Sequence, residues 1–271
     1  MDNTVKFPKN SFGKRMKSML KVDFRRMAGS RLFYILLATA LIIPILMTVM
    51  MTMMDGSVSV DPQTGVETII EGPENTWQSI GALPTADGEA LGGMDVMAMC
   101  NINMMFMLAA VFICLFISDD FRSGYAKNLF TVRAKKGDYV ISKTIAGFVC
   151  GAFMLIAYFI GAMLGGAISG LSFDLGTLTP ANIVMCMIAK VFLMLVFVAI
   201  FVLISVAAKQ KAWLSICGSL GGGMLLFMMV PMITPLSSTM MNVVVCFAGG
   251  ALFSLGLGVA SNKVLSKTSL V

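Results

Sequence analysis

The amino-acid sequence predicts an all-α polytopic membrane protein with six transmembrane helices and both termini in the cytoplasm. Three observations lead to this prediction. Hydrophobic residues make up 58% of the 271 residues and charged residues only 13%, a composition far from that of soluble domains. Six apolar stretches are long enough to cross a hydrocarbon layer of about 30 Å. The charged residues are segregated along the chain, so that basic and acidic segments alternate between the apolar stretches.

The N-terminal segment, residues 1–31, is strongly basic and is expected to lie in the cytoplasm. It holds nine of the 20 Lys and Arg residues. Over residues 12–27, apolar side chains follow the helical period on one side and basic side chains cover the other. This pattern predicts an amphipathic interfacial helix whose apolar face meets the acyl chains of the bilayer and whose cations meet lipid phosphates. Asp23 interrupts the apolar face. The alternative is that the segment only sets the orientation of the chain.

The transmembrane domain is expected over residues 32–260. Its first span, at 1.5 Å rise per residue, would extend about 35 Å. The fifth span contains several glycines and ends in Pro231 and Pro235, which predicts a break or a re-entrant outer part. The six expected spans are residues 32–54, 96–118, 144–168, 182–206, 212–233 and 242–260.

The orientation follows from the charges of the segments between the spans, because Lys and Arg near span ends are retained on the cytoplasmic side. With the N-terminus inside, four cytoplasmic segments hold 19 of the 20 basic residues: 1–31, 119–143, 207–211 and the C-terminal tail, 261–271. The expected external segments hold nine carboxylates and no basic residue: about 55–95, 169–181 and 234–241. Both termini are therefore assigned to the cytoplasm.

The composition excludes several classes of chemistry. The chain has no histidine, so it cannot build a Ser-His-Asp triad, a Cys-His protease site or a His-ligated zinc site. Its six cysteines lie in or beside apolar runs without a CxxC pair, which favours packing over disulfides or metal binding. It has no Walker-type phosphate-binding run and no buried chain of carboxylates, so its energy must come from another protein. The net charge of +6 arises from segments that set orientation, and no nucleic-acid partner is expected.

The segment between the second and third spans is predicted to contain a short helix. Asp119 and Asp120 would open this helix as N-cap and first-turn anions. Phe121, Tyr125 and Leu129 then recur on one face. An exposed aromatic face would favour a docking partner, and the alternative is that the face packs under the protein's own helix ends.

The same segment carries a run of residues with a recognisable order: Asp120, Phe121, Arg122, Ser123 and Gly124, then Lys127, Asn128, Leu129, Arg133, Gly137, Asp138, Tyr139, Ser142 and Lys143. This run resembles the loop after the second span in type-2 ABC exporter permeases. That class shows an acidic residue three or four positions before Gly, a short amphipathic helix, an Arg, and Tyr-x-x-x-Lys at the start of span three. The chain departs from the class at Tyr125, where many relatives have a small hydroxyl residue, and in its long first external loop.

The resemblance implies the membrane-spanning permease subunit of an ABC exporter in a bacterial plasma membrane. It implies a homodimer whose short coupling helix docks in a separate ATPase subunit, where ATP and Mg²⁺ bind, while this chain itself binds no cofactor and is not an enzyme. The implied cargo is an amphipathic peptide or drug-like compound moved outward, and the acidic outer loop favours a cationic, membrane-active peptide. The coupling residues implied by the resemblance are Asp119, Asp120, Phe121, Arg122, Ser123, Gly124, Tyr125, Lys127, Asn128 and Leu129. The alternative is a membrane scaffold or sensor that transports nothing.

Lys190 is the single charged residue well inside an expected span, roughly 13 Å from the outer end of the fourth. A lysine near the midplane costs about 3 kcal/mol or more, and it normally faces the interior of a helix bundle or a wet cavity. One interpretation places Lys190 in the substrate pathway together with Asn101 and Asn103. The other gives it a structural bond to Asn101, Asn103 or Asp95.

Overall fold

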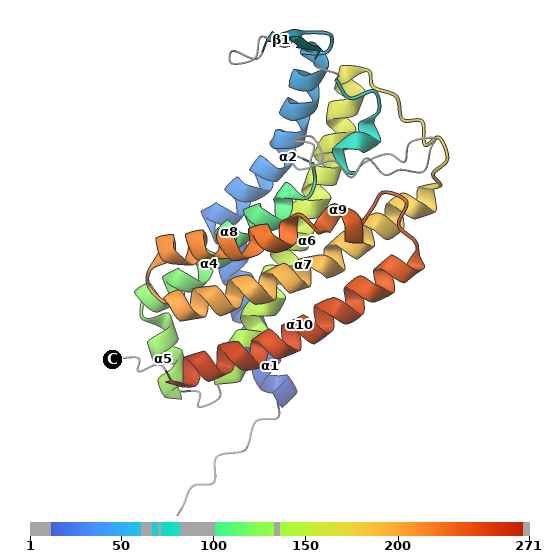
Figure 1. Cartoon of the computed structure of the whole chain (residues 1–271). Helices are drawn as coiled ribbons and strands as arrows, with labels where there is room; N and C mark the ends of the chain where they lie inside the picture. Colours follow the sequence, from blue (N-terminus) through green and yellow to red (C-terminus); the bar gives the residue numbers. More distant parts are fainter. Residues whose placement is uncertain (1–11, 61–66, 70–71, 82–100, 133–135, 268–271) are drawn as a thin grey trace, which may run out of the picture.

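The computed structural model describes residues 12–60, 67–69, 72–81, 101–132 and 136–267, and within them the chain is mostly helical (Figure 1). The α-helices are α1 (Phe12–Ala28), α2 (Arg31–Met53), α4 (Met104–Arg122), α5 (Tyr125–Val132), α6 (Lys136–Ser169), α7 (Pro180–Ala208), α8 (Ala212–Phe227), α9 (Val230–Ile233) and α10 (Met240–Lys267). Between α2 and α4 lie a two-stranded antiparallel ribbon, β1 (Val58–Val60) with β2 (Glu67–Ile69), and a 3-10 helix, η1 (Thr76–Ser79).

Five described helices are long and apolar enough to cross a membrane: α2, α4, α6, α7 and α10. The all-α polytopic membrane fold predicted from the sequence is therefore confirmed. In the region of the expected fifth span, α8 has 16 residues and stops at Phe227, and the four-residue α9 follows after a break at Met228 and Met229. The expected start of the second span, residues 96–100, lies outside the described residues.

Two helices extend well beyond the apolar stretches that predicted them. Helix α6 begins at Lys136, eight residues before the expected start of span three, and α10 continues to Lys267 instead of ending near residue 260. The added turns mix charged and apolar residues, so apolar length alone does not predict them. They continue the backbone hydrogen bonding of the two helices.

The helices surround α7, which packs against α4, α6, α8 and α10 (Figure 1). Helix α2 lies against α6, and the two approach closely at Gly161 and Gly165. A Cβ atom at Gly161 would overlap the Leu41 carbonyl oxygen and the Pro44 ring, so this crossing depends on the missing side chain. The small residues of α6, the third expected span, therefore allow close contacts between helices of the same chain.

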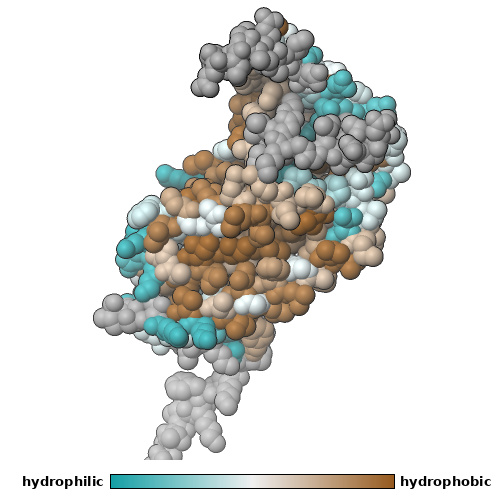
Figure 2. Space-filling view, in the orientation of Figure 1, coloured by the Kyte–Doolittle hydropathy of each residue, from teal (hydrophilic) through white to brown (hydrophobic). Residues whose placement is uncertain are grey.

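Much of the described surface is apolar, as Figure 2 shows for the face formed by α7, α8 and α10. The exposed large side chains on α10 include Val245, Leu252, Leu255 and Val259. A broad, continuous apolar surface is unfavourable in water. It is the exterior expected for a protein that is surrounded by lipid.

Candidate functional site

The junction between α4 and α5 places the two predicted carboxylates differently from the sequence analysis. Asp119 and Asp120 belong to the last turn of α4, which ends at Arg122, and they do not open the short helix. The Ser123 N–H and hydroxyl both donate to the Asp119 carbonyl oxygen, at 2.8 and 2.7 Å. Gly124 then adopts a φ of +75°, a left-handed conformation that ends helices and that glycine adopts without strain. This break separates Phe121 from the helix that carries Tyr125.

The Asp120 side chain is fully buried and joins three partners from two other helices. Its Oδ1 lies 2.5 Å from Nη1 of Arg26 on α1. Its Oδ2 lies 2.7 Å from Nζ of Lys143 and accepts a 2.9 Å hydrogen bond from the Tyr139 hydroxyl, both on α6. A buried carboxylate is tolerated only when it is paired in this way.

Asp23 on α1 forms a second buried carboxylate site beside Asp120. Its Oδ1 accepts from Nζ of Lys143 at 2.7 Å, and its Oδ2 accepts from the Ser142 hydroxyl at 2.5 Å. Lys143 therefore bridges the two carboxylates. We call the six residues Asp23, Arg26, Asp120, Tyr139, Ser142 and Lys143 the charge cluster. It contains two anions and two cations, so its charges balance.

Aromatic rings surround the two cations of the charge cluster and connect it to α5. The Lys143 Nζ lies 4.0 Å from the centroid of the Phe116 ring, and the Arg26 guanidinium carbon lies 4.4 Å from the centroid of Tyr125. Burial alone would lower the pKa of Arg26, but the neighbouring Asp120 carboxylate raises that pKa above its ordinary value. Arg26 is thus held in its charged form, and the first residue of α5 rests on it.

Helix α1 packs against the protein more closely than the sequence indicated. Met16, Met19 and Met27, expected at the acyl boundary, are buried, and α1 packs against α6. An ion pair between Arg15 and Asp138, with a 2.8 Å distance from Nε to Oδ2, adds a second connection to α6. The opposite side of α1 exposes the cations Lys14, Lys17, Lys21 and Arg25.

The aromatic face predicted for the loop is turned toward the protein. Phe121 is buried and packs edge-on against Tyr139, and Tyr125 and Leu129 are half-buried. This arrangement matches the second interpretation of the sequence, in which the aromatic face packs under the ends of the protein's own helices. The side of the α4–α5 junction left open is polar and carries Arg122, Ser123, Lys127, Asn128 and Thr131.

Lys190 is buried near the opposite end of the bundle, between α4, α7 and α9. Its Nζ donates to Asn103 Oδ1 at 2.7 Å and to Thr234 Oγ1 at 3.1 Å. The Asn103 N–H donates to Asn101 Oδ1 at 2.9 Å, so the three residues predicted for a substrate pathway form one hydrogen-bonded chain. No carboxylate pairs with Lys190 among the described residues. Asp95, the other partner considered, lies outside them.

The sequence analysis missed two features of these sites. The charge cluster had a signal, because Asp23 interrupts an apolar helix face and therefore needed a buried partner. The other members of the cluster could not be identified from the sequence, because Lys143 and Asp120 lie about a hundred residues further along the chain than Asp23. Thr234 as a partner of Lys190 had no sequence signal.

Comparisons with known proteins identify a family for most of the chain. A family model described as ABC-2 family transporter protein matches residues 19–224, which extend from α1 into α8 and include the charge cluster, α5 and Lys190. No curated protein and no solved structure matches the chain. Since the matched segment is well over half of the sequence, the resemblance to ABC-2 type permeases is confirmed, and the protein belongs to the ABC-2 transporter family.

Proposed function

We propose that this chain is the permease subunit of an ABC exporter and that it moves an amphipathic substrate, a membrane-active peptide, outward across a bacterial plasma membrane. Family membership makes it a membrane subunit of an ABC transporter that works with a separate ABC ATPase. Export, the peptide cargo and a homodimeric permease go beyond that membership. The observation that carries the proposal is the attachment of α5 to the charge cluster.

In this proposal α5 is the coupling helix, and its open polar side meets the ATPase subunit. Lys127 and Asn128 are exposed there, whereas Phe121, Ala126 and Leu129 face the protein and hold the helix in place. Because an exposed cation such as Lys127 favours a carboxylate partner at an interface, the complementary ATPase surface is expected to be polar and acidic.

The charge cluster gives a mechanical path from α5 to the spans. Tyr125 rests on Arg26, which pairs with Asp120 on α4, and Lys143 joins Asp120 to α6. Displacement of α5 by the ATPase would therefore be transmitted to α1, α4 and α6 together. Salt bridges that are buried and geometrically well paired behave as rigid connections, because separating them exposes charges to an apolar environment.

The proposed topology has six spans, with α8 and α9 as the fifth and both termini in the cytoplasm. The exposed cations of α1, together with Lys209 and Lys211 between α7 and α8, then lie on the α5 side of the membrane. The β1–β2 ribbon and η1 lie outside. The substrate would contact the chain of Asn101, Asn103 and Lys190 during transport, and the acidic loop over residues 55–95 would favour cationic cargo at the outer face.

The docking surface can be tested by reversing one charge on α5. We expect Lys127→Glu to reduce co-purification of the ATPase subunit at least about tenfold, because a central interface contact contributes on the order of 1.4 kcal/mol or more. The matched control is Lys14→Glu, an exposed charge reversal in the first turn of α1, about three helical turns before Arg26. Equal co-purification of both variants and the unaltered protein would contradict α5 as the coupling helix.

A further inference from the structure

Helix α5 is attached to the protein near both of its ends. Tyr125, its first residue, rests on Arg26, and Phe130, near its last turn, packs edge-on against Tyr139 with ring centroids 5.3 Å apart. The Phe130 ring also lies near Lys136, the first residue of α6, whose Nζ is 5.9 Å from the ring centroid. Because Lys136 is not a member of the charge cluster, this contact opens a second connection from α5 to the rest of the protein.

The ammonium group of Lys136 holds the end of α10. Its Nζ donates a 3.0 Å hydrogen bond to the carbonyl oxygen of Leu265, and α10 ends at Lys267. The last four carbonyl groups of a helix have no partner within it and carry its partial negative charge, so a lysine there stabilises the helix end. Helix α10 contains no Asp or Glu, and no ion pair involves Lys136 among the described residues. The helix end therefore fixes the position of this cation.

The hydrogen bond of Lys136 is part of a packed junction between α6 and α10. The Leu265 side chain is fully buried, and Val264 packs against the same hydrophobic core. Gly137 lies beside the Asn262 amide, where an added Cβ atom would make contact at 3.6 Å. Close-packed groups transmit displacement instead of absorbing it. A displacement of the first turn of α6 would therefore move the end of α10 with it.

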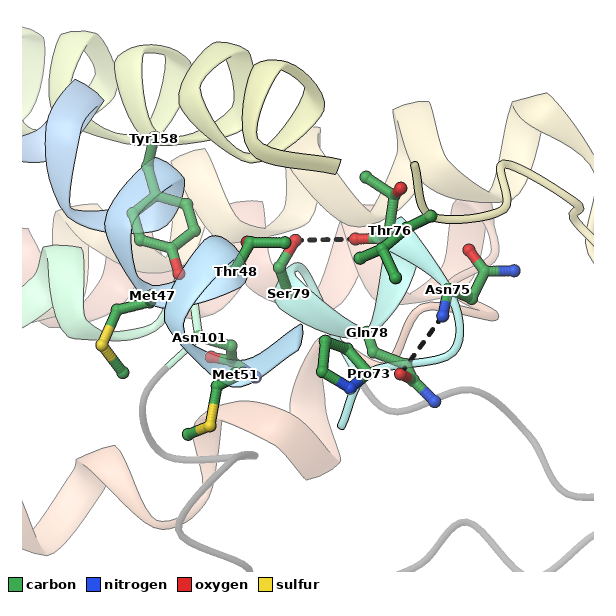
Figure 3. Close-up of a pocket in the computed structure, with 11 residues that line it drawn as sticks. Met47, Thr48, Met51, Pro73, Asn75, Thr76, Gln78, Ser79, Asn101 and Tyr158 are labelled. Atoms are coloured by element: carbon green, nitrogen blue, oxygen red, sulfur yellow. Dashed lines mark hydrogen bonds between the residues drawn. The ribbon is translucent and has the colours of Figure 1, made fainter. Parts of the chain in front are cut away.

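The other end of α6 is enclosed by α2 and η1. The Thr76 side chain of η1 stands over Gly166, where a Cβ atom would overlap it, and the Thr76 N–H donates to the Ser172 carbonyl oxygen at 3.0 Å. Figure 3 shows Tyr158 of α6 together with Thr48 of α2 and the residues of η1 around one cavity. With this end held, a displacement of α5 acts on the turns of α6 that carry Lys136.

Helix α10, by contrast, is open along its outer side. Leu252, Leu255 and Val259 are exposed there. Gly249 and Gly256 have open space where a Cβ atom would lie. The described part of the chain therefore offers no protein contact on this side that would resist a shift of α10, and lipid can yield to it.

The inner side of α10 packs along α7 and leads toward Lys190. An added Cβ atom at Gly250 would lie 2.9 Å from the Phe192 carbonyl oxygen, so the two backbones approach closely there. Phe247 packs edge-on against Phe192, with ring centroids 5.1 Å apart. Since Phe192 follows Lys190 by two residues, a shift of α10 reaches the part of α7 that carries the buried polar chain.

We propose that Lys136 is a positioning residue that transmits the displacement of α5 to α10, and through α10 to α7. This connection acts beside the charge cluster, which joins α5 to α1, α4 and α6. The inference rests on the proposed function, in which α5 is the coupling helix. It adds a route to the helix that carries Lys190, and loss of this route leaves the open polar side of α5 unchanged.

The test measures the displacements of α5 and α10 separately, in the complex with the ATPase subunit in lipid nanodiscs. In a variant without the six native cysteines, spin labels at Ile35→Cys on α2 and Asn128→Cys report α5. Labels at Ile35→Cys and Lys267→Cys report the end of α10. The two distances are measured by electron paramagnetic resonance without nucleotide, and again with Mg²⁺, ATP and orthovanadate. We expect both distances to change in the complex with Lys136.

Lys136→Met should keep the change at α5 and reduce the fraction of molecules with the shifted α10 distance at least about threefold. One contact in a coupled network contributes a factor of roughly 2 to 30. Lys136→Arg, which keeps a charged donor, should retain both changes. Phe130→Leu, which removes the ring on the α5 side of Lys136, should also reduce the α10 change. Lys17→Met, on the exposed side of α1, is the matched control and should alter neither distance.

An equal α10 change with and without Lys136→Met, at equal thermal stability, would overturn the inference and leave α5 as the coupling helix. A change at α5 without one at α10 in the complex with Lys136 would do the same. Loss of both changes in Lys136→Met would mean that Lys136 only holds α5 in place, which also overturns the inference. No change of either distance in the complex with Lys136 would contradict the proposed function itself.

Discussion

At the scale of single residues, Asp23, Asp120 and Lys143 are buried together in one cluster, whereas Lys190 is buried at the other end of the bundle. Asp23, Asp120 and Lys143 have side chains that are at most 1% exposed, and Arg26 closes the group from its edge. Each ion has lost most of its hydration, so the cluster is stable only while all four charges are present. Such a group contributes specificity, because no other register of α1 on α6 pairs the same ions.

Removing the central cation should destabilise the protein strongly. Lys143→Met removes the ion pair of Asp23 and leaves Asp120 with Arg26, and we expect a loss of about 3–5 kcal/mol, seen as a lower midpoint of thermal unfolding in detergent. Lys267→Met, an exposed lysine at the end of α10, is the control and should change little.

A compensating substitution separates charge balance from packing. Adding Asp23→Asn to Lys143→Met restores neutrality, since Asp120 and Arg26 remain paired, and should recover part of the lost stability. A midpoint for Lys143→Met equal to that of the unaltered protein would show that the cluster does not stabilise the fold.

At this scale the sequence predicts the short helix between α4 and α6 better than it predicts the contacts around that helix. The sequence predicts one docking helix over the run from Asp119 to Leu129, yet the structure divides this run at Gly124 and buries Phe121. Periodicity could not reveal the division, because Phe121 and Tyr125 keep a spacing of four across the break. Helix α4 continues to Arg122, one turn beyond the expected end of the second span at residue 118. The burial of Asp120 in this last turn explains the extension.

At the scale of elements, glycine positions decide how closely the helices approach. Gly161 allows α2 to contact α6 at Leu41 and Pro44, whereas Gly249 on α10 has open space around it. The two glycines have the same intrinsic cost in a helix but opposite structural roles.

Alanine substitution should therefore have opposite effects at these two positions. We expect Gly161→Ala to lower the free energy of unfolding by about 1–3 kcal/mol, because the new methyl group forces α2 away from α6. Gly249→Ala should leave it unchanged or raise it by up to about 1 kcal/mol through helix propensity. Thermal unfolding of the two purified variants measures both effects, and a loss of equal size in each would contradict the close crossing.

At the scale of the whole molecule, an apolar band separates two polar ends. The end with α1 and α5 is rich in cations, and the end with η1 and the β1–β2 ribbon carries Asp55, Glu74 and Asp174 among its described residues. This separation supports the proposed orientation, since basic segments remain on the cytoplasmic side.

The orientation is directly measurable with introduced cysteines. In a variant without its six native cysteines, Ser57→Cys beside β1 should react with a membrane-impermeant maleimide in intact cells. Asn128→Cys on α5 should react only after the membrane is permeabilised. The reverse pattern would place α5 outside and would rule out its contact with a cytoplasmic ATPase.

The fold class, the positions of five long spans, the break in the stretch after residue 212 and the family could all be predicted from the sequence. These properties depend on composition, hydropathy and local motifs, which involve residues close together in the sequence. The tertiary structure alone decided which charges meet, how α4 ends, which face of α5 stays open and where a cavity forms. These depend on side chains brought together from about 40 to 120 residues apart, as in the Lys190–Thr234 and Asp23–Lys143 contacts, and pairing over such separations leaves no local pattern.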